Sequence, residues 1–438
     1  MANEWSNKSL DALGRIVTGK TPPSTIVDAF GGNVPFVTPS DMDGTRIISD
    51  TARTLSASGQ TAVKNTVIPK NAVMVSCIGS DMGKAALAGA DCITNQQINS
   101  IVIDTDDSPL FVYYNLSTRK SEIRGAASGS AQPILNKSAF GRLEIELPPP
   151  EEQRAIAHIL GTLDDKIELN RKQNEMLEAM ARTLFKAWFV DFEPVRAKLE
   201  GRWQRGQSLP GLPAHLYDLF PDRLVESELG EIPEGWGISD LGNVCSYLNR
   251  GISPKYIDLG GVFVLNQKCI RDFSIDFSKA RRHDVVQKKI DGRALELGDV
   301  LVNSTGVGTL GRVAQVKRLS EATIVDSHVT VVRAGPQINP MYLGAFMNMK
   351  QPEIEAMGEG STGQTELSRT KLGALKILLP TDDVLNHFAK HTQTVSESIA
   401  ANQKNSETLA QLRDTLLPKL ISGELRVPDA ERIVGAAV

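Results

Sequence analysis

The sequence repeats itself at about half its length, and this duplication limits the possible folds more than any other feature. Short matching motifs occur in the same order in both halves, at separations between 227 and 232 residues. The pairs are Trp5 and Trp236, Leu13-Gly14 and Leu241-Gly242, Val73-Met74-Val75 and Val300-Leu301-Val302, Gly129-Ser130 and Gly360-Ser361, and Leu147-Pro148 and Leu379-Pro380. Since small loop insertions would produce such a drift, the collinear series indicates two copies of one structural unit in a chain of 438 residues.

Each copy consists of a loop-rich part followed by a helical part. The loop-rich parts, 1–150 and 232–380, carry short β-type runs at Ala72–Cys77, Ser100–Ile103, Val262–Leu265, Val300–Asn303 and Thr330–Val332. The helical parts are 151–192 and 381–425. Between the copies, 193–231 contains four prolines and predicts a linker with little regular structure, and 426–438 is a C-terminal tail. The pattern predicts an α/β (mixed α+β) fold class, in which two similar domains are separated by two long helices.

The two helical parts carry matching heptad seams. The first seam includes Ile156, Leu160, Leu163, Ile167, Asn170, Leu177 and Leu184, and the second includes Val395, Ile399, Asn402, Leu409 and Leu416. One such stripe usually marks a helix packed on its own domain, but its length and its duplication favour pairing. Asn170 and Asn402 are equivalent, and a seam Asn can fix register. The linker lets the chain turn back, so we expect an antiparallel coiled coil, with Pro418 disturbing its last turn.

Composition and charge favour a globular protein of the cytoplasm. The first 13 residues lack a basic start with an apolar core, and no run approaches the roughly 18 apolar residues of a membrane span. Four scattered cysteines give no zinc signal and fit a reducing compartment. The net charge of −4 does not itself indicate nucleic acid. Three basic patches, Arg281-Arg282-His283, Lys288-Lys289 and Lys317-Arg318, could follow phosphates, although solvated surface is the simpler interpretation of each.

Motifs for catalysis or a cofactor are weak. Gly306–Gly311 matches GxGxxG, but the following residues alternate like a strand, so we expect a glycine-rich hairpin and no dinucleotide site. Asp164-Asp165-Lys166 could hold a nuclease metal, yet it lies mid-helix and is expected to be solvated surface. No nucleophile triad, metal-ligand pair or adenine-methyltransferase motif can be assigned. We therefore expect a non-catalytic chain without a cofactor or metal of its own.

Three segments resemble the specificity subunits of Type I restriction–modification systems. They are Leu229-Gly230-Glu231-Ile232-Pro233-Glu234-Gly235-Trp236 followed by Leu241-Gly242, Leu147-Pro148-Pro149-Pro150-Glu151-Glu152-Gln153-Arg154-Ala155-Ile156, and Leu417-Pro418-Lys419-Leu420-Ile421-Ser422-Gly423-Glu424-Leu425. The resemblance covers essentially the whole chain, although Asn3-Glu4-Trp5 lacks the Ile-Pro-Glu-Gly lead-in. It implies that 1–150 and 232–380 are target-recognition domains, each binding half of an asymmetric bipartite DNA target, on an antiparallel helical spacer.

The resemblance also implies partners. These are double-stranded DNA, two modification subunits that use S-adenosylmethionine to methylate adenine, and restriction subunits that need ATP and Mg²⁺. A helix of about 35 residues spans roughly 50 Å, so two domains on such a spacer could reach half-sites about one DNA turn, or roughly 34 Å, apart. Two alternatives are a coiled-coil scaffold without a DNA role and a single-chain DNA-modifying enzyme. Divergent loops on duplicated domains disfavour the first, and missing motifs disfavour the second.

Base recognition would come from loop positions that recur in both copies and carry polar side chains. In the first copy these residues are Lys20, Thr21, Lys84, Asn95, Gln96, Gln97, Ser130 and Gln132. In the second copy they are Arg250, Ser253, Lys255, Arg312, Ser327, His328, Gln364 and Thr365. The alternative for each is a turn that only satisfies its own backbone.

Overall fold

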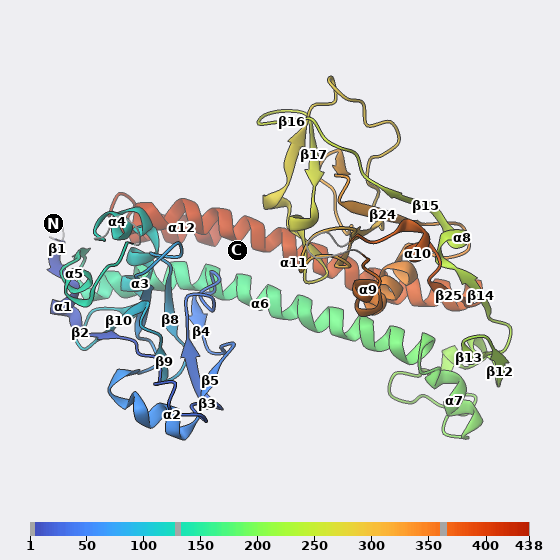
Figure 1. Cartoon of the computed structure of the whole chain (residues 1–438), viewed down its shortest axis with the longest axis horizontal. Helices are drawn as coiled ribbons and strands as arrows, with labels where there is room; N and C mark the ends of the chain where they lie inside the picture. The colour runs from blue at the N-terminus through green and yellow to red at the C-terminus, as the bar shows by residue number, and fades with distance from the viewer. Residues whose placement is uncertain (1–4, 128–132, 360–365, 438) are drawn as a thin grey trace. The chain divides into compact units, whose positions relative to one another are not determined.

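The computed structural model describes residues 5–127, 133–359 and 366–437, and the chain divides into two compact units (Figure 1). Unit 1 comprises Met1–Leu169 and Asn405–Val438, and unit 2 comprises Asn170–Lys404. Each unit contains one α/β domain and a stretch of both long helices. In the described part of the chain, no helix is long and apolar enough to cross a membrane.

The domain of unit 1 has two sheets, ordered β2-β10-β7-β8-β4 and β5-β3-β9-β6, and a ribbon of β1 with β11. Its strands are β1 (Ser6–Ser9), β2 (Gly14–Thr18), β3 (Phe30–Val37), β4 (Ile47–Ile48), β5 (Thr54–Leu55), β6 (Val67–Ile68), β7 (Val73–Ser76), β8 (Ala85–Ala88), β9 (Cys92–Thr94), β10 (Ile98–Ile103) and β11 (Glu144–Leu147). Its helices are α1 (Leu10–Leu13), α2 (Ala57–Ala62), η1 (Lys64–Thr66), α3 (Pro109–Thr118), α4 (Lys120–Gly125) and α5 (Lys137–Gly141).

The domain of unit 2 has corresponding sheets, ordered β15-β24-β21-β22 and β16-β20-β17-β23, and a ribbon of β14 with β25. Its strands are β14 (Gly237–Asp240), β15 (Cys245–Arg250), β16 (Tyr256–Ile257), β17 (Val262–Leu265), β18 (Ile270–Arg271), β19 (Ser274–Ile275), β20 (Arg281–His283), β21 (Val300–Asn303), β22 (Val313–Gln315), β23 (Thr323–Val325), β24 (Val329–Ala334) and β25 (Lys376–Leu379). Its helices are α8 (Leu241–Val244), η3 (Gln267–Cys269), η4 (Phe277–Lys279), α9 (Pro340–Ala356) and α10 (Arg369–Gly373).

These matching sheets confirm the predicted mixed fold and its internal repeat. In each domain the second sheet contains one parallel pair, β3 with β9 and β17 with β23. The segment Gly306–Gly311 connects the antiparallel strands β21 and β22, and three of its glycines have positive φ. The predicted glycine-rich hairpin is therefore confirmed.

The two long helices, α6 (Pro150–Phe189) and α11 (Asp382–Ile421), each contain 40 residues. In unit 1 the beginning of α6 packs with the end of α11, where Leu160 and Leu416 share one core. In unit 2 the end of α6 packs with the beginning of α11, where Trp188 and Phe388 share another. The pairing is antiparallel, as predicted. The expected disturbance at Pro418 was wrong, because α11 continues through this residue to Ile421.

The start of α6 is fastened by one buried amide. The Nε2 of Gln153 donates to Asp107 Oδ1 at 2.7 Å and to the Pro148 carbonyl at 2.9 Å. Its Oε1 accepts the Ser108 N–H at 2.9 Å. At the corresponding places in unit 2, 231 and 232 residues later, stand Ile338 and Leu385, both buried. A polar pair in one copy is thus replaced by an apolar pair in the other.

The prediction of little regular structure for 193–231 was wrong. This segment forms α7 (Glu193–Leu199), η2 (Ala214–Leu219), β12 (Leu224–Ser227) and β13 (Gly230–Pro233). Pro194 lies in the first turn of α7, where a missing N–H costs nothing. Trp203 and Phe220 are buried in the core of unit 2. The prolines therefore separate short elements, and large buried apolar side chains hold this segment on the core. The tail is also ordered, since α12 (Val427–Ala437) follows α11.

The duplication extends into the turn after each long helix. Phe192 and Gly423, 231 residues apart, both adopt left-handed backbone, with φ of 53° and 71°. In unit 2 the Phe192 ring centroid lies 5.9 Å from that of Trp236. In unit 1 a Cβ on Gly423 would lie 3.1 Å from the Trp5 ring. The two matched tryptophans thus cover two matched turns.

Candidate nucleic-acid interface

In unit 1, the end of β2 and the β9–β10 turn come together and gather five of the predicted residues. The Lys20 N–H donates to the Thr94 carbonyl at 2.9 Å, and Thr21 Oγ1 donates to Gln96 Oε1 at 2.7 Å. The Asn95 side chain accepts the Gln97 N–H and donates to Gln97 Oε1, both at 3.0 Å. Lys20 and Gln96 are exposed on this cluster. The turn is therefore fixed from within by Asn95, while ammonium and amide groups face solvent.

A glycine makes this close approach possible. A Cβ on Gly19 would lie 2.2 Å from the Asn95 carbonyl oxygen, a distance that no side chain can occupy. In unit 2 a Cβ on Gly251 would lie 2.0 Å from the Val325 carbonyl oxygen. Each glycine directly follows an edge strand, β2 in unit 1 and β15 in unit 2. The same backbone junction therefore exists in both copies.

The junction in unit 2 carries different side chains. Asp326 Oδ1 accepts the His328 N–H at 2.9 Å, which repeats the turn made by Asn95. Burial raises the pKa of the Asp326 carboxyl. His328 Nδ1 lies 2.7 Å from Thr305 Oγ1, and Ser327 is partly exposed. The Arg250 guanidinium pairs with Glu366 and donates to the Leu367 carbonyl at 2.8 Å.

The remaining predicted residues lie in other places. Lys84 pairs with Asp81 at 3.0 Å in the β7–β8 turn, and Arg312 donates to the Gly308 carbonyl at 2.8 Å in the corresponding β21–β22 turn. The exposed residues Ser253 and Lys255 precede β16. Ser130, Gln132, Gln364 and Thr365 lie outside the described residues.

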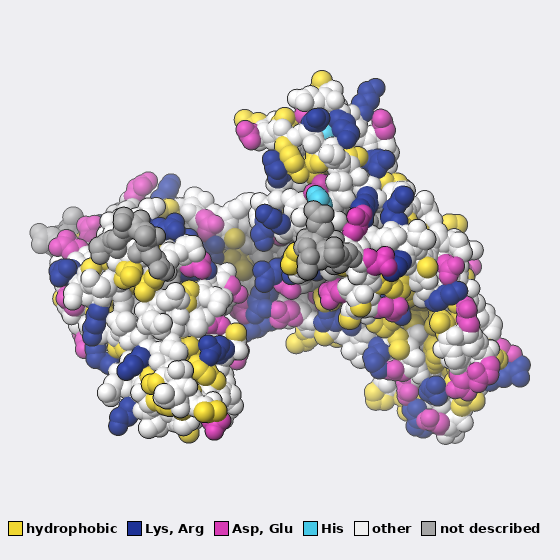
Figure 2. Space-filling view, in the orientation of Figure 1, with side chains coloured by type: hydrophobic (Ala, Val, Ile, Leu, Met, Phe, Trp, Pro, Cys, Tyr) yellow, Lys and Arg dark blue, Asp and Glu magenta, His cyan; other side chains and the backbone are white. Residues whose placement is uncertain are grey.

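Figure 2 shows Lys and Arg side chains among hydrophobic ones over the part of unit 2 that carries β16 and β17. The Arg281 guanidinium stacks 3.3 Å from the Tyr256 ring centroid. His283 is buried, and both ring nitrogens are bonded: Nδ1 accepts the Lys255 N–H at 2.9 Å, and Nε2 donates to the Lys288 carbonyl at 2.8 Å. His283 therefore has a structural role, while Arg281 and Lys289 stay exposed.

Two interpretations as solvated surface were wrong. Lys317 is only 16% exposed and pairs with Glu178 on α6 at 2.9 Å. Asp164 is only 11% exposed and accepts hydrogen bonds from Tyr114 and Arg413, whereas Asp165 is 70% exposed. A signal for Asp164 was available. Arg413 lies four residues after Leu409 and three before Leu416, so it continues the seam of the second helix, where a partly buried guanidinium needs a carboxylate partner.

The predicted seam residues fall into two groups. Ile156, Leu160, Leu163, Asn170, Ile399, Leu409 and Leu416 are buried, and Ile167, Leu177, Leu184, Val395 and Asn402 are partly buried. Asn402 donates to Asn174 Oδ1 at 2.9 Å, and Asn170 donates to the Asn402 carbonyl at 3.4 Å. The amides of the seam therefore pair across the two helices within unit 2.

The exposed groups of these junctions are amides, hydroxyls, an imidazole and cations. Such groups suit base edges and phosphates. Across 5–127, 133–359 and 366–437, no group of three or more His, Cys, Asp or Glu side chains could hold a metal ion.

Comparison with known proteins agrees with this geometry. A family described as the Type I restriction modification DNA specificity domain matches residues 2–179. Along its whole length the chain is similar to specificity subunits of Type I restriction enzymes. The Type I restriction enzyme MjaIX specificity subunit of Methanocaldococcus jannaschii is 26% identical over 438 aligned residues, which cover 97% of this chain and 94% of the relative. The HindI specificity subunit of Haemophilus influenzae is 24% identical, with 72% and 76% covered.

The fold of this chain is similar to that of a solved structure. The crystal structure of the S subunit of a Type I restriction–modification system from M. genitalium aligns with a TM-score of 0.58 over 96% of each chain, at 16% sequence identity.

Proposed function

We propose that this chain is the DNA-recognition subunit of a Type I restriction–modification complex. The observation that carries the proposal is a shared junction with different side chains. Gly19 and Gly251 allow the same close contact, and Asn95 and Asp326 make the same turn. The side chains presented there differ, with Lys20 and Gln96 in one copy and Arg250 and Ser327 in the other. Different donors and acceptors recognise different bases, so each domain binds its own half of an asymmetric bipartite target.

The proposal includes the other members of the complex. Two modification subunits, which hold S-adenosylmethionine and methylate adenine, bind this chain, and restriction subunits supply nuclease and translocation activity with ATP and Mg²⁺. The chain itself performs no chemistry, and α6 and α11 serve as the spacer between its two recognition domains. The complex works in the cytoplasm, where it meets DNA.

An apolar groove in unit 2 supports the binding of a partner. The groove has a volume of about 590 Å³ and is lined by Met176, Met180, Leu184, Trp188 and Val395, among others. Met176 and Met180 are 66% and 58% exposed. Exposed methionines on a helix adapt to an incoming apolar helix face. We expect a modification subunit to place such a helix here.

Replacing Met176 and Met180 by Glu should weaken co-purification of the modification subunit by about tenfold or more, because charge would be buried at the centre of the contact. Glu175→Gln is the matched control, since Glu175 is 61% exposed on the same helix and pairs only one turn away with Arg171. Unchanged co-purification of the double variant would remove the groove from the proposal.

Co-expression with the neighbouring modification subunits, followed by genome-wide mapping of methylated adenines, tests the function itself. The expected result is one split target with two different halves and a constant gap. Methylation without a split target, or nuclease or methyltransferase turnover by the isolated chain, would contradict the proposal.

A further inference from the structure

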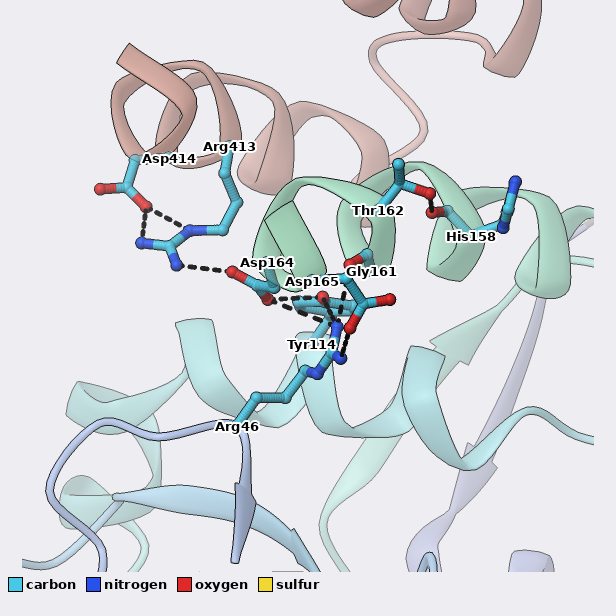
Figure 3. A network of polar contacts seen from close by, with 9 residues as sticks. All are labelled: Arg46, Tyr114, His158, Gly161, Thr162, Asp164, Asp165, Arg413 and Asp414. Carbon is cyan, nitrogen blue, oxygen red and sulfur yellow. Dashed lines mark hydrogen bonds and ion pairs between the residues drawn. The ribbon is translucent and has the colours of Figure 1, made fainter. Parts of the chain in front are cut away.

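A partly buried polar cluster in unit 1 is centred on Asp164 (Figure 3). Tyr114 donates from Oη to Asp164 Oδ2 at 2.6 Å, and Arg413 donates from Nη1 to Asp164 Oδ1 at 2.7 Å. The Arg46 guanidinium lies 3.9 Å from Asp164 Oδ2, donates to the Gly161 carbonyl at 3.1 Å and pairs with Asp165. We call Arg46, Tyr114, Asp164 and Arg413 the Asp164 network.

The Asp164 network places charge where water has little access. The side chains of Arg46 and Asp164 are 13% and 11% exposed, and that of Arg413 is 29% exposed. Burial and the neighbouring Asp164 carboxylate raise the pKa of Tyr114, so its hydroxyl stays protonated and donates. Removing one member would take a hydrogen bond or an ion pair from a charged group with little access to water. The arrangement therefore holds its members in one geometry.

The network joins four separate parts of unit 1. Arg46 precedes β4, Tyr114 belongs to α3, Asp164 to α6 and Arg413 to α11. The first two come from the recognition domain, and the other two come from the paired long helices. Apolar packing between these parts would tolerate sliding, whereas hydrogen bonds to one carboxylate fix direction as well as distance.

Among the described residues of unit 2, no such network stands at the corresponding place. The equivalents of Asp164, Tyr114 and Arg413 are Ser396, Ala345 and Ala181. These three small residues line a cavity of about 70 Å³, with the Lys317–Glu178 ion pair on its wall. In the first copy, one carboxylate has two guanidinium partners. At the corresponding place in the second copy there is a cavity beside a single ion pair.

We propose that the Asp164 network positions the first recognition domain on the helix pair and so fixes the gap at which its half-site is accepted. The inference rests on the proposed function in DNA recognition. The residues of the network contact no base; they are positioning residues. The second domain has a single ion pair, Lys317–Glu178, at the corresponding place, so most of the selectivity for gap length comes from the first domain.

The test uses the complex of the full chain with its modification subunits. Methylation rates are compared on DNA with the natural gap and on DNA with one base pair added or removed, a change of about 3.4 Å and roughly 35°. Arg413→Met and Tyr114→Phe should each lower the preference for the natural gap by about tenfold, the scale of a hydrogen bond to a buried charge. Arg413→Lys, which keeps the charge, should restore most of it, and Glu175→Gln should leave it unchanged.

Tyr114→Phe removes one oxygen and keeps the packing, so it reports on position and not on folding. The base preference within each half-site should stay the same in every variant. A general loss of structure would instead change that preference as well. If Tyr114→Phe and Arg413→Met both keep the wild-type gap preference in an assembled complex, the inference is wrong while the proposed function stands. If the wild-type complex methylates no split target, the proposed function fails and the inference fails with it.

Discussion

Gly19 and Gly251 each sit where two backbone segments meet too closely for any side chain. Gly19→Ala should displace the β9–β10 turn and lower methylation that depends on the first half-site by more than about tenfold, the effect of losing a well-placed base contact. Recognition of the second half-site should stay intact. Gly251→Ala should give the reverse pattern. Rates on DNA altered in one half at a time measure both effects.

Gly125→Ala serves as the control in the first domain, because a Cβ there meets no atom of the described residues within 4 Å. Equal losses in both half-sites from Gly19→Ala would show that the junctions do not belong to independent recognition surfaces.

Much of the site could be located from the sequence, but its internal partners could not. Lys20, Thr21 and Gln96 were chosen because polar residues recur at matched loop positions, and the structure brings them together. The same reasoning gave no indication that Arg250 pairs with Glu366 or that Asp164 is buried. Such pairings join residues 50 to 249 positions apart, so the comparison of matched loop positions does not reveal them.

At the scale of elements, heptad periodicity predicted α6 and α11 because a long stripe repeats the same spacing many times. The segment 193–231 was mispredicted for the opposite reason. Its elements are short, and the meaning of each proline depends on whether it starts a turn or interrupts one. Trp203 and Phe220 anchor the segment, and such large apolar residues indicate burial. They do not repeat at a helical or strand spacing, so they do not predict an element.

The contact between Gln153 and Asp107 ties the start of α6 to its domain, and its replacement by Leu385 and Ile338 suggests a direct test. Gln153→Leu alone should lower the free energy of unfolding by about 2–4 kcal/mol, because the Asp107 carboxylate loses a buried donor. Adding Asp107→Ile should recover most of that loss, since the apolar pair already packs in the other copy. Denaturant unfolding of the four combinations measures the coupling.

If the losses of unfolding free energy from Gln153→Leu and Asp107→Ile simply add in the double variant, the apolar pair does not replace the polar pair and this prediction is wrong. The isosteric variant Gln153→Glu, which replaces the donating amide with a second carboxylate beside Asp107, should be at least as harmful as Gln153→Leu.

At the scale of the whole molecule, the duplicated architecture makes each recognition domain a replaceable part. The ribbon of β1 with β11 brings both ends of the first domain together, so residues 6–147 form a natural unit for exchange. Replacing this unit by that of a related specificity subunit should change the first half-site and leave the second unchanged. Methylation mapping of the assembled complex checks this outcome. A change in both halves would show that the domains do not act separately.

The pair at the start of α6 also limits how the two halves of the gene can exchange DNA. A crossover between the codons for positions 107 and 153 and their counterparts would join Asp107 to Leu385, or Ile338 to Gln153. Either recombinant would bury one polar side chain against an apolar partner and lose stability. Crossovers outside this interval keep each pair together. The residues at positions 107 and 153, and those at 338 and 385, are therefore each expected to stay matched within their own repeat.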